Sequence, residues 1–299
     1  MRAVGLIAAL ALLWGSGFFW IALALEGFTP TQLTFARLAL GALVLVPLVL
    51  VRRLERPSGW RMWVHITVSA FVANALPYTL FAVAEQTVPS SVAGVVNATT
   101  PLWTLLVAFF VSGADAGLTG RRVLGVLLGF IGVVVVVEPW RGVLGGSTGG
   151  LVATVAAAAS YGVAYVYQAR YLTNRGISPL SLTAFQLVAA ACLLLPTLPF
   201  GGSGPGPTTG SALALLILGV AGTGLALVIN FTLIATEGPT AASVVTYLLP
   251  LVAVALGVTF LDEPARWTLV AGGLLILVGV GLARGRSRSW LAPNRRPTS

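Results

Sequence analysis

Apolar runs of about 20 residues recur from one end of this chain to the other, and no polar stretch between them is long enough to form a soluble domain. A helix of that length rises about 30 Å, which matches the hydrocarbon core of a bilayer. Charged residues make up only 8% of the 299 residues, against about 25% in soluble domains. The sequence therefore predicts an integral membrane protein.

Hydropathy, with the Gly, Pro and charged residues that punctuate the runs, predicts ten transmembrane helices and an all-α fold. The expected helices lie near residues 3–25, 31–51, 62–83, 90–112, 119–137, 149–169, 179–198, 211–234, 240–261 and 266–284. Four tryptophans fall at expected helix ends, where indole rings contact membrane lipids. They are Trp60, Trp63, Trp140 and Trp267.

The basic residues predict the orientation of the chain. All 17 are arginines, and 14 of them lie on the side of the N-terminus if ten helices cross the membrane. Arg141 and Arg266 lie on the opposite side, and Arg37 lies inside a helix. The positive-inside rule then places both termini in the cytoplasm, as for a multi-pass protein of a bacterial inner membrane. Arginines spread over short loops also argue against nucleic acid as a partner.

The chain repeats itself with an offset of 149 residues. The segment with Thr29, Pro30, Arg37 and Pro47 corresponds to Ser178, Pro179, Gln186 and Pro196, and the pair Asn97 and Pro101 to Thr246 and Pro250. Two five-helix units explain this pattern: residues 1–140 and 147–285, followed by a basic cytoplasmic tail, 286–299. Because five is odd, the second unit enters the membrane from the other side, so the repeats are inverted.

The second unit carries a recognisable signature. The run from Ala242 to Leu251, followed by Leu261-Asp262-Glu263-Pro264 and the stretch from Gly272 to Gly279, resembles the end of an EamA domain. Pro30 to Arg37 resembles the second helix of that domain, although the first unit reads Gly113-Ala114-Asp115-Ala116 where the second has Asp262-Glu263-Pro264. The whole chain thus resembles the ten-helix members of the drug/metabolite transporter superfamily that contain two EamA domains. The resemblance implies export of small metabolites, often amino acids, by alternating access. It also leaves a lipid-linked sugar flippase and a multidrug exporter as alternatives.

In inverted-repeat transporters the substrate lies near the midplane, where helices of both halves are interrupted. Pro101 and Pro250 are the expected helix breaks, because proline removes a backbone donor in mid-helix. The polar residues beside them would line a cavity: Asn97, Thr100, Thr246 and Tyr247. The alternative is that both prolines are packing kinks.

Aromatic residues near the middle of the expected helices favour a substrate with an apolar or aromatic body and polar ends. They are Trp14, Tyr78, Trp103, Tyr161 and Tyr165. Ordinary helix packing explains any single one of them equally well.

Three further polar residues are candidates for the binding site. Arg37 is the charged side chain clearly inside a span, where it would bind a substrate carboxylate or be a structural arginine bonded to helix carbonyls. The amides of Asn74 and Asn230 would contact the ligand or join helices. Neither role is decided by the sequence.

Two groups of small residues predict close packing of the fifth and tenth helices, with a contact between two copies of the chain as the alternative. They are Gly125, Gly129 and Gly132 in one helix and Gly272, Gly273 and Gly279 in the other. The sequence is compatible with a monomer or a homodimer.

Other classes of protein lack the residues they require. The eight acidic residues fall at expected helix ends or loops, which leaves no carboxylate for a proton relay in mid-membrane, and the absence of lysine excludes a P-loop. We therefore expect facilitated diffusion or exchange. His65 and Ser69 share a helix face, but no nucleophile elbow or set of metal ligands accompanies them. We expect no catalytic residues, no metal and no cofactor, and an intramembrane enzyme is the least favoured alternative.

Overall fold

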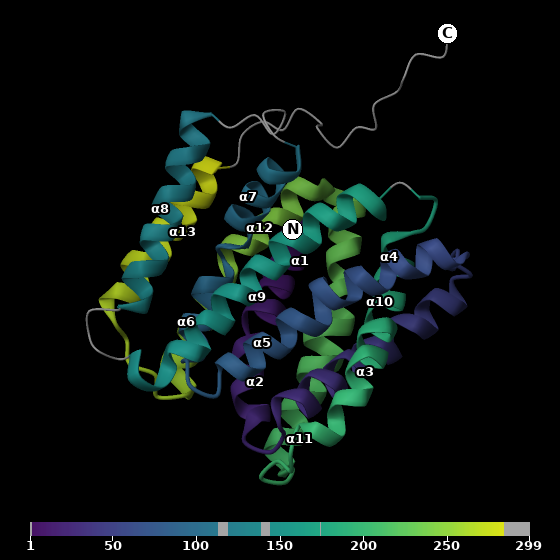
Figure 1. Cartoon of the computed structure of the whole chain (residues 1–299), viewed down its shortest axis with the longest axis horizontal. Coiled ribbons are helices and arrows are strands. Elements are labelled where there is room, and N and C mark those ends of the chain that lie inside the picture. Colours follow the sequence, from purple (N-terminus) through teal and green to yellow (C-terminus); the bar gives the residue numbers. More distant parts are fainter. Residues whose placement is uncertain (1, 113–118, 139–143, 174, 284–299) are drawn as a thin grey trace.

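The computed structural model describes residues 2–112, 119–138, 144–173 and 175–283 of the chain, and within these ranges it contains helices and no strands (Figure 1). Eight helices there are long and apolar enough to cross a membrane, and two further apolar helices, Leu248–Phe260 and Trp267–Ala283, are shorter. The predicted all-α membrane fold with about ten helices is therefore confirmed. The tail 286–299 lies outside the described residues, as do Asp115, Trp140 and Arg141.

The first half of the chain forms five spans, three of which are interrupted. In order, these are α1 (Arg2–Gly15) with α2 (Gly17–Leu25); α3 (Pro30–Val51); α4 (Trp60–Ala70), a π-helical segment η1 (Phe71–Ala75) and α5 (Leu76–Ala84); α6 (Ser90–Asn97) with α7 (Thr100–Ser112); and α8 (Gly120–Val137).

The second half repeats this plan. It comprises α9 (Leu144–Tyr171); α10 (Pro179–Leu194) with a 3₁₀ segment η4 (Leu195–Phe200); α11 (Thr209–Leu216), a second π-helical segment η5 (Ile217–Leu225) and α12 (Ala226–Phe260); and α13 (Trp267–Ala283). The two π-helical segments lie at corresponding positions, because η1 shifted by 149 residues falls within η5.

The second helix of each half begins in the same way. Thr29 accepts a hydrogen bond from the backbone N–H of Gln32, whose side chain in turn accepts one from the backbone N–H of Thr29. In the other half Ser178 accepts a hydrogen bond from the backbone N–H of Ser181. A side-chain acceptor at the N-cap and a proline at the first helical position are what the unpaired donors of a helix start require.

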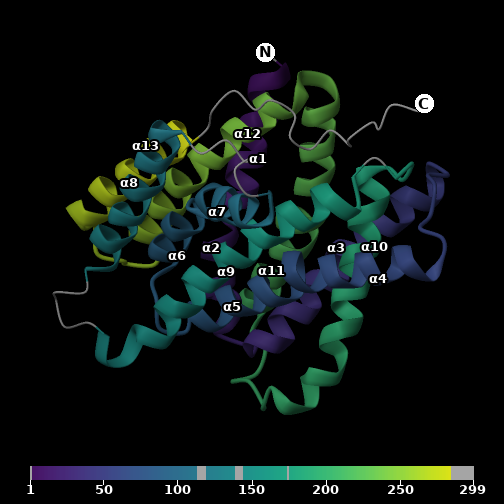
Figure 2. The same cartoon turned by 45° about the horizontal axis from the view of Figure 1, so that its top comes forward.

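The helix α12 corrects one expected boundary, since it continues through residues 234–240, where the sequence predicted the end of one helix and the start of the next. It is nevertheless bent back on itself. A Cβ built on Gly15 would lie 3.1 Å from the carbonyl of Leu249, and one on Gly222, just before α12, would lie 3.6 Å from that of Leu13. A straight helix would separate Gly222 from Leu249 by about 40 Å at 1.5 Å per residue. Both arms of α12 therefore flank α1, and Figure 2 shows the turn between them.

Contacts between the halves occur in corresponding pairs. The second helices pack on each other, α3 on α10, as do the fifth helices, α8 on α13. The first span of one half packs on the third span of the other, α9 on α5 and α2 on α11, and also on the fourth, α9 on α7 and α1 on α12. This is the pattern that two inverted repeats related by a pseudo-twofold axis produce.

The glycines of α8 and α13 are used within the chain. A Cβ on Gly132 would lie 2.7 Å from the carbonyl of Gly272, and one on Gly125 would lie 2.5 Å from that of Gly279. The two backbones therefore touch along these faces, which are not available for contact with a second copy. The α8–α13 pair forms one edge of the bundle (Figure 1).

Candidate substrate site

Arg37 reaches from α3 to the π-helical segment of the other half. Its Nε donates a hydrogen bond of 3.0 Å to Oγ1 of Thr223, and its guanidinium carbon lies 3.9 Å from the centre of the Tyr78 ring. Among the described residues no carboxylate forms an ion pair with it, and its two terminal nitrogens have no hydrogen-bond partner. A partly accessible guanidinium with a free two-nitrogen edge is suited to bind a carboxylate in bidentate geometry.

Thr223 was not predicted as a site residue. Its hydroxyl donates to the carbonyl of Leu218, 3.0 Å away, and accepts from Arg37. That i to i−5 bond follows the π-helical turn, in which the backbone ring is one residue wider than in an α-helix. The repeat offset would have revealed Thr223, because 149 residues separate it from Asn74, which the sequence did single out.

Three tyrosines on α5 and α9 surround Arg37 on one side. The rings of Tyr78 and Tyr161 are 6.4 Å apart with their planes at 69°. Tyr161 is within electrostatic range of Arg37 and Tyr165, and Tyr165 is within range of Tyr78. Tyr165 lies within the Thr148–Tyr171 span, and its side chain is 57% exposed. The site combines one cation with an aromatic wall.

Asn74 lies in η1 next to this group. Its side chain is 7% exposed, and the amide nitrogen Nδ2 has no partner in the described part of the chain. A buried donor without a partner costs about 1–3 kcal/mol, so Asn74 is a credible ligand contact.

The candidates on α6 and α7 have structural contacts, although the buried indole Nε1 of Trp103 has no hydrogen-bond partner in the described part of the chain. Thr100 donates to the carbonyl of Asn97, 2.8 Å away. Trp103 packs edge-on against Phe130 of α8, with ring centres 4.9 Å apart, and its Cβ lies against Gly162. The helix is interrupted at Ala98 and Thr99, immediately before Pro101. The structure places these side chains in the helix break and between α7, α8 and α9 rather than beside Arg37.

The break expected at Pro250 is absent, because α12 continues through it. The helix accommodates this proline within a packed segment in which Leu249 and Pro250 are both buried. Of the two proline positions, only the one in the first half interrupts its helix.

The remaining candidates lie along α1 and α12. Trp14 packs on the buried cluster around Leu10 and Leu249. Asn230 and Thr246 are half-buried, and the side chain of Tyr247 lies outside the described residues. Within the described part no hydrogen bond or ring contact joins Trp14, Asn230 or Thr246 to Arg37 or Tyr78.

A second polar cluster lies at the position of the other half that corresponds to Arg37. Nε2 of Gln168 donates to Oγ of Ser69 at 2.9 Å and to Oε1 of Gln186 at 3.4 Å. Gln186 is the repeat counterpart of Arg37. The two halves therefore place polar side chains at equivalent depths, but only the first supplies a charge.

His65 and Ser69 do not form a nucleophile and base. Nδ1 of His65 is 2.7 Å from the hydroxyl of Tyr167, its ring stacks on Tyr171 at 4.8 Å, and the Ser69 hydroxyl accepts from Gln168. The described residues also contain no group of three His, Cys, Asp or Glu side chains that could hold a metal ion.

Glu85 lies directly after α5, at a helix end as the sequence predicted, but both its carboxylate oxygens are buried and have no hydrogen-bond partner among the described residues. Its neighbour Glu263 accepts hydrogen bonds from the backbone N–H groups of Ser90 and Ser91, at 2.7 and 3.0 Å. A carboxyl group removed from water is thus present in the protein interior.

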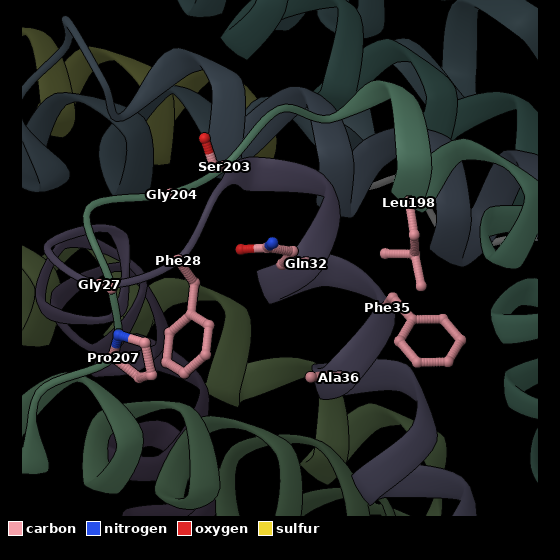
Figure 3. Close-up of a pocket in the computed structure, with 10 residues that line it drawn as sticks. Gly27, Phe28, Gln32, Phe35, Ala36, Leu198, Ser203, Gly204 and Pro207 are labelled. Carbon is pink, nitrogen blue, oxygen red and sulfur yellow. The ribbon is translucent and has the colours of Figure 1, made fainter.

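A separate hollow of about 390 Å³ lies at the start of α3 (Figure 3). Phe28, Phe35, Leu198 and Pro207 give it a mostly apolar lining, and Gln32 points into it. None of the site residues predicted from the sequence lines this hollow.

Comparisons with known proteins agree with this architecture. The model of the EamA-like transporter family matches residues 1–138 and again residues 148–284. The uncharacterized transporter YdfC of Bacillus subtilis is 25% identical over 274 residues, covering 90% of this chain and 86% of that protein. The uncharacterized inner membrane transporter YedA of Escherichia coli K12 is 27% identical over 258 residues, covering 85% of this chain and 81% of that protein. A crystal structure with 24% identity, which covers 94% of this chain and 96% of its own, superposes with a TM-score of 0.65 and shares the fold.

Proposed function

Because this chain belongs to the EamA-like transporter family, a family of multi-pass membrane transporters, we propose that it carries small amphipathic metabolites with a carboxylate group, most suitably amino acids with an apolar or aromatic side chain. The observation that carries this proposal is the unpaired guanidinium of Arg37 beside Tyr78 and Tyr161. In low-dielectric surroundings such a cation needs an anion, which the substrate supplies.

The transport cycle we propose is alternating access. The two inverted halves move against each other, and the site between α3, α5, α9 and η5 opens to one side of the membrane at a time. The fifth helices, α8 and α13, hold together through their glycine contacts and act as scaffold. Both termini face the cytoplasm of a bacterial inner membrane in this proposal, as the positive-inside rule requires. Export is the direction that the family resemblance implies.

The unpaired cation also separates the proposed substrates from the alternatives. A quaternary amine, as in multidrug export, would be repelled by Arg37 unless it carried an anionic group of its own. An amino acid places a carboxylate on Arg37 and its side chain among the tyrosines.

A thermal-shift screen of the purified protein tests the substrate class. A ligand that binds only the folded state stabilises it, by about 2.7 kcal/mol at 100 times its Kd. We expect hydrophobic and aromatic amino acids to raise the unfolding temperature, and nucleosides and quaternary amines not to. Counterflow of labelled L-phenylalanine into proteoliposomes loaded with unlabelled L-phenylalanine then tests transport. Stabilisation by quaternary amines alone would contradict the proposal.

A further inference from the structure

Glu85 is the buried acidic group that the transport site described above does not use. Both of its carboxylate oxygens are buried, and no N–H or O–H among the described residues donates to either of them. An ionised carboxylate without donors is expensive to bury, and such groups take up a proton instead. Glu85 therefore has the surroundings of a proton-binding group.

The neighbouring carboxylate is accommodated differently. Glu263 accepts two backbone hydrogen bonds at the N-terminus of α6, whereas Glu85 accepts none among the described residues. The hydroxyl oxygens of Ser90 and Ser91 are buried at the same place, 2% and 0% exposed, and have no partner in the described part. Of two carboxyl groups that share this region, Glu85 is thus the one that binds the proton.

The Arg37 guanidinium lies over the ring of Tyr78, seven residues before Glu85 along the same helix, and it is the cation that acts on the Glu85 carboxyl. The elements packed on α5 also contribute Tyr161 and Tyr165 of α9, which are uncharged at neutral pH, while α2 contributes no titratable side chain. Glu85 lies just beyond the Trp60–Ala84 span. Burial raises the pKa of its carboxyl well above the usual range, the Glu263 carboxylate raises that pKa further, and the Arg37 guanidinium lowers it.

We propose that Glu85 is a proton site linked to anion binding: when a substrate carboxylate binds Arg37, the Glu85 carboxylate takes up one proton from the medium and becomes a neutral carboxylic acid. The inference rests on the proposed binding of a carboxylate at Arg37. The anion neutralises the charge that favours ionised Glu85, so the proton binds more tightly when the substrate is present. Linkage is reciprocal, and substrate then binds more tightly at low pH.

This linkage sets a direction for the pH effect on transport. Substrate and proton bind together and leave together. Export is therefore faster into an alkaline medium than into an acidic one, and an inward proton gradient drives uptake of the same substrate.

The proton site can be tested without any substrate. Infrared spectroscopy of the purified full chain detects the carbonyl stretch of a protonated carboxyl group, and we expect a band that titrates well above the ordinary glutamate pKa of about 4.3. The band disappears in Glu85→Gln, which is isosteric with the protonated acid, and persists in Glu26→Gln, whose carboxylate is exposed. A band that is unchanged in Glu85→Gln, or one that titrates in the wild type at the ordinary glutamate pKa, overturns the proposal.

The linkage is tested in proteoliposomes with L-phenylalanine. In the wild type we expect the apparent affinity to rise by roughly 5- to 150-fold on acidification across the titration, the usual range of coupling between two sites, and a pH gradient to drive accumulation. Glu85→Gln keeps counterflow but loses both pH effects. Absence of counterflow in the wild type refutes the proposed function. Counterflow that is indifferent to pH, or accumulation driven by a sodium gradient at constant pH, refutes the proton site alone.

Discussion

Arg37 and Gln186 occupy equivalent positions in the two inverted halves, 149 residues apart, but their side chains serve different networks. Arg37 donates to Thr223 of the opposite half, whereas Gln186 accepts from Gln168 within its own half. The backbone is thus close to twofold symmetric, but the charges of the side chains at this position are not symmetric. Because Arg37 is the only cation that the described residues place at the proposed site, we expect this site to hold one anionic group at a time.

Replacing Arg37 by glutamine makes the two halves alike at this position. We expect Arg37→Gln to weaken binding of L-phenylalanine by roughly 10- to 100-fold, because a hydrogen bond to a charged group contributes about 1.5–3 kcal/mol. The measurement is the Kd from thermal-shift titration. L-phenylalaninamide, which lacks the carboxylate, is the matched control ligand, and its binding should not weaken in Arg37→Gln. Equal losses for the acid and the amide would show that Arg37 is structural.

We predict that Tyr165 faces a water-accessible chamber beside the proposed site. In a Cys192→Ala background, Tyr165→Cys should react with a membrane-impermeant thiol reagent, and L-phenylalanine should slow the reaction. Leu127 on α8 is almost equally exposed, 56% against 57%, but it lies on the lipid-facing edge. Leu127→Cys should therefore not react. Equal labelling of both positions would mean that the surface beside Tyr165 is not an enclosed chamber.

The spans could be predicted from the sequence because their apolar runs match the bilayer thickness, and the caps at Thr29 and Ser178 mark helix starts locally. Contacts between residues far apart in the chain could not be predicted in this way. The partner of Arg37 is Thr223, 186 residues away, and nothing near either residue indicates that they meet. Only the repeat offset, applied to Asn74, indicated that Thr223 belongs to the site.

The surroundings of Glu85 could not be predicted either. Its position after an apolar run is typical of a solvated helix end, but its carboxylate oxygens are buried and Glu263, from the other half of the chain, acts on them. The break expected at Pro250 failed because tertiary packing of α12 on α1 and α6 overrides the local effect of a proline. Sequence periodicity locates helices well, but it does not show which helix ends are buried in the folded protein.

The ion pair between Glu138 and Arg266 should stabilise the end of α8. Nη1 of Arg266 lies 2.9 Å from Oε2 of Glu138, whose side chain is only 1% exposed. Arg266→Gln removes this ion pair from a buried carboxylate, and we expect a loss of about 1–3 kcal/mol in the free energy of unfolding. The double variant Glu138→Gln, Arg266→Gln also removes the buried charge and should be more stable than Arg266→Gln. The midpoint of chemical unfolding in detergent measures both, and a double variant that is less stable than the single one would contradict this account.

Two glycines of α13 allow a controlled test of the contact between α8 and α13. A Cβ on Gly279 would lie 2.5 Å from the carbonyl of Gly125 and 2.6 Å from the backbone nitrogen of Gly129, atoms that cannot move without displacing α8. A Cβ on Gly281, two residues later, would meet nothing within 4 Å. Alanine favours a helix over glycine by about 1 kcal/mol, so Gly281→Ala should stabilise the protein slightly. Gly279→Ala adds the same propensity but forces the backbones apart, at a cost of about 1–3 kcal/mol for overpacking, and its unfolding temperature should fall below that of the wild type. If both substitutions raised the unfolding temperature alike, α8 and α13 would not be in backbone contact, and the scaffold role of the fifth helices would have no physical basis.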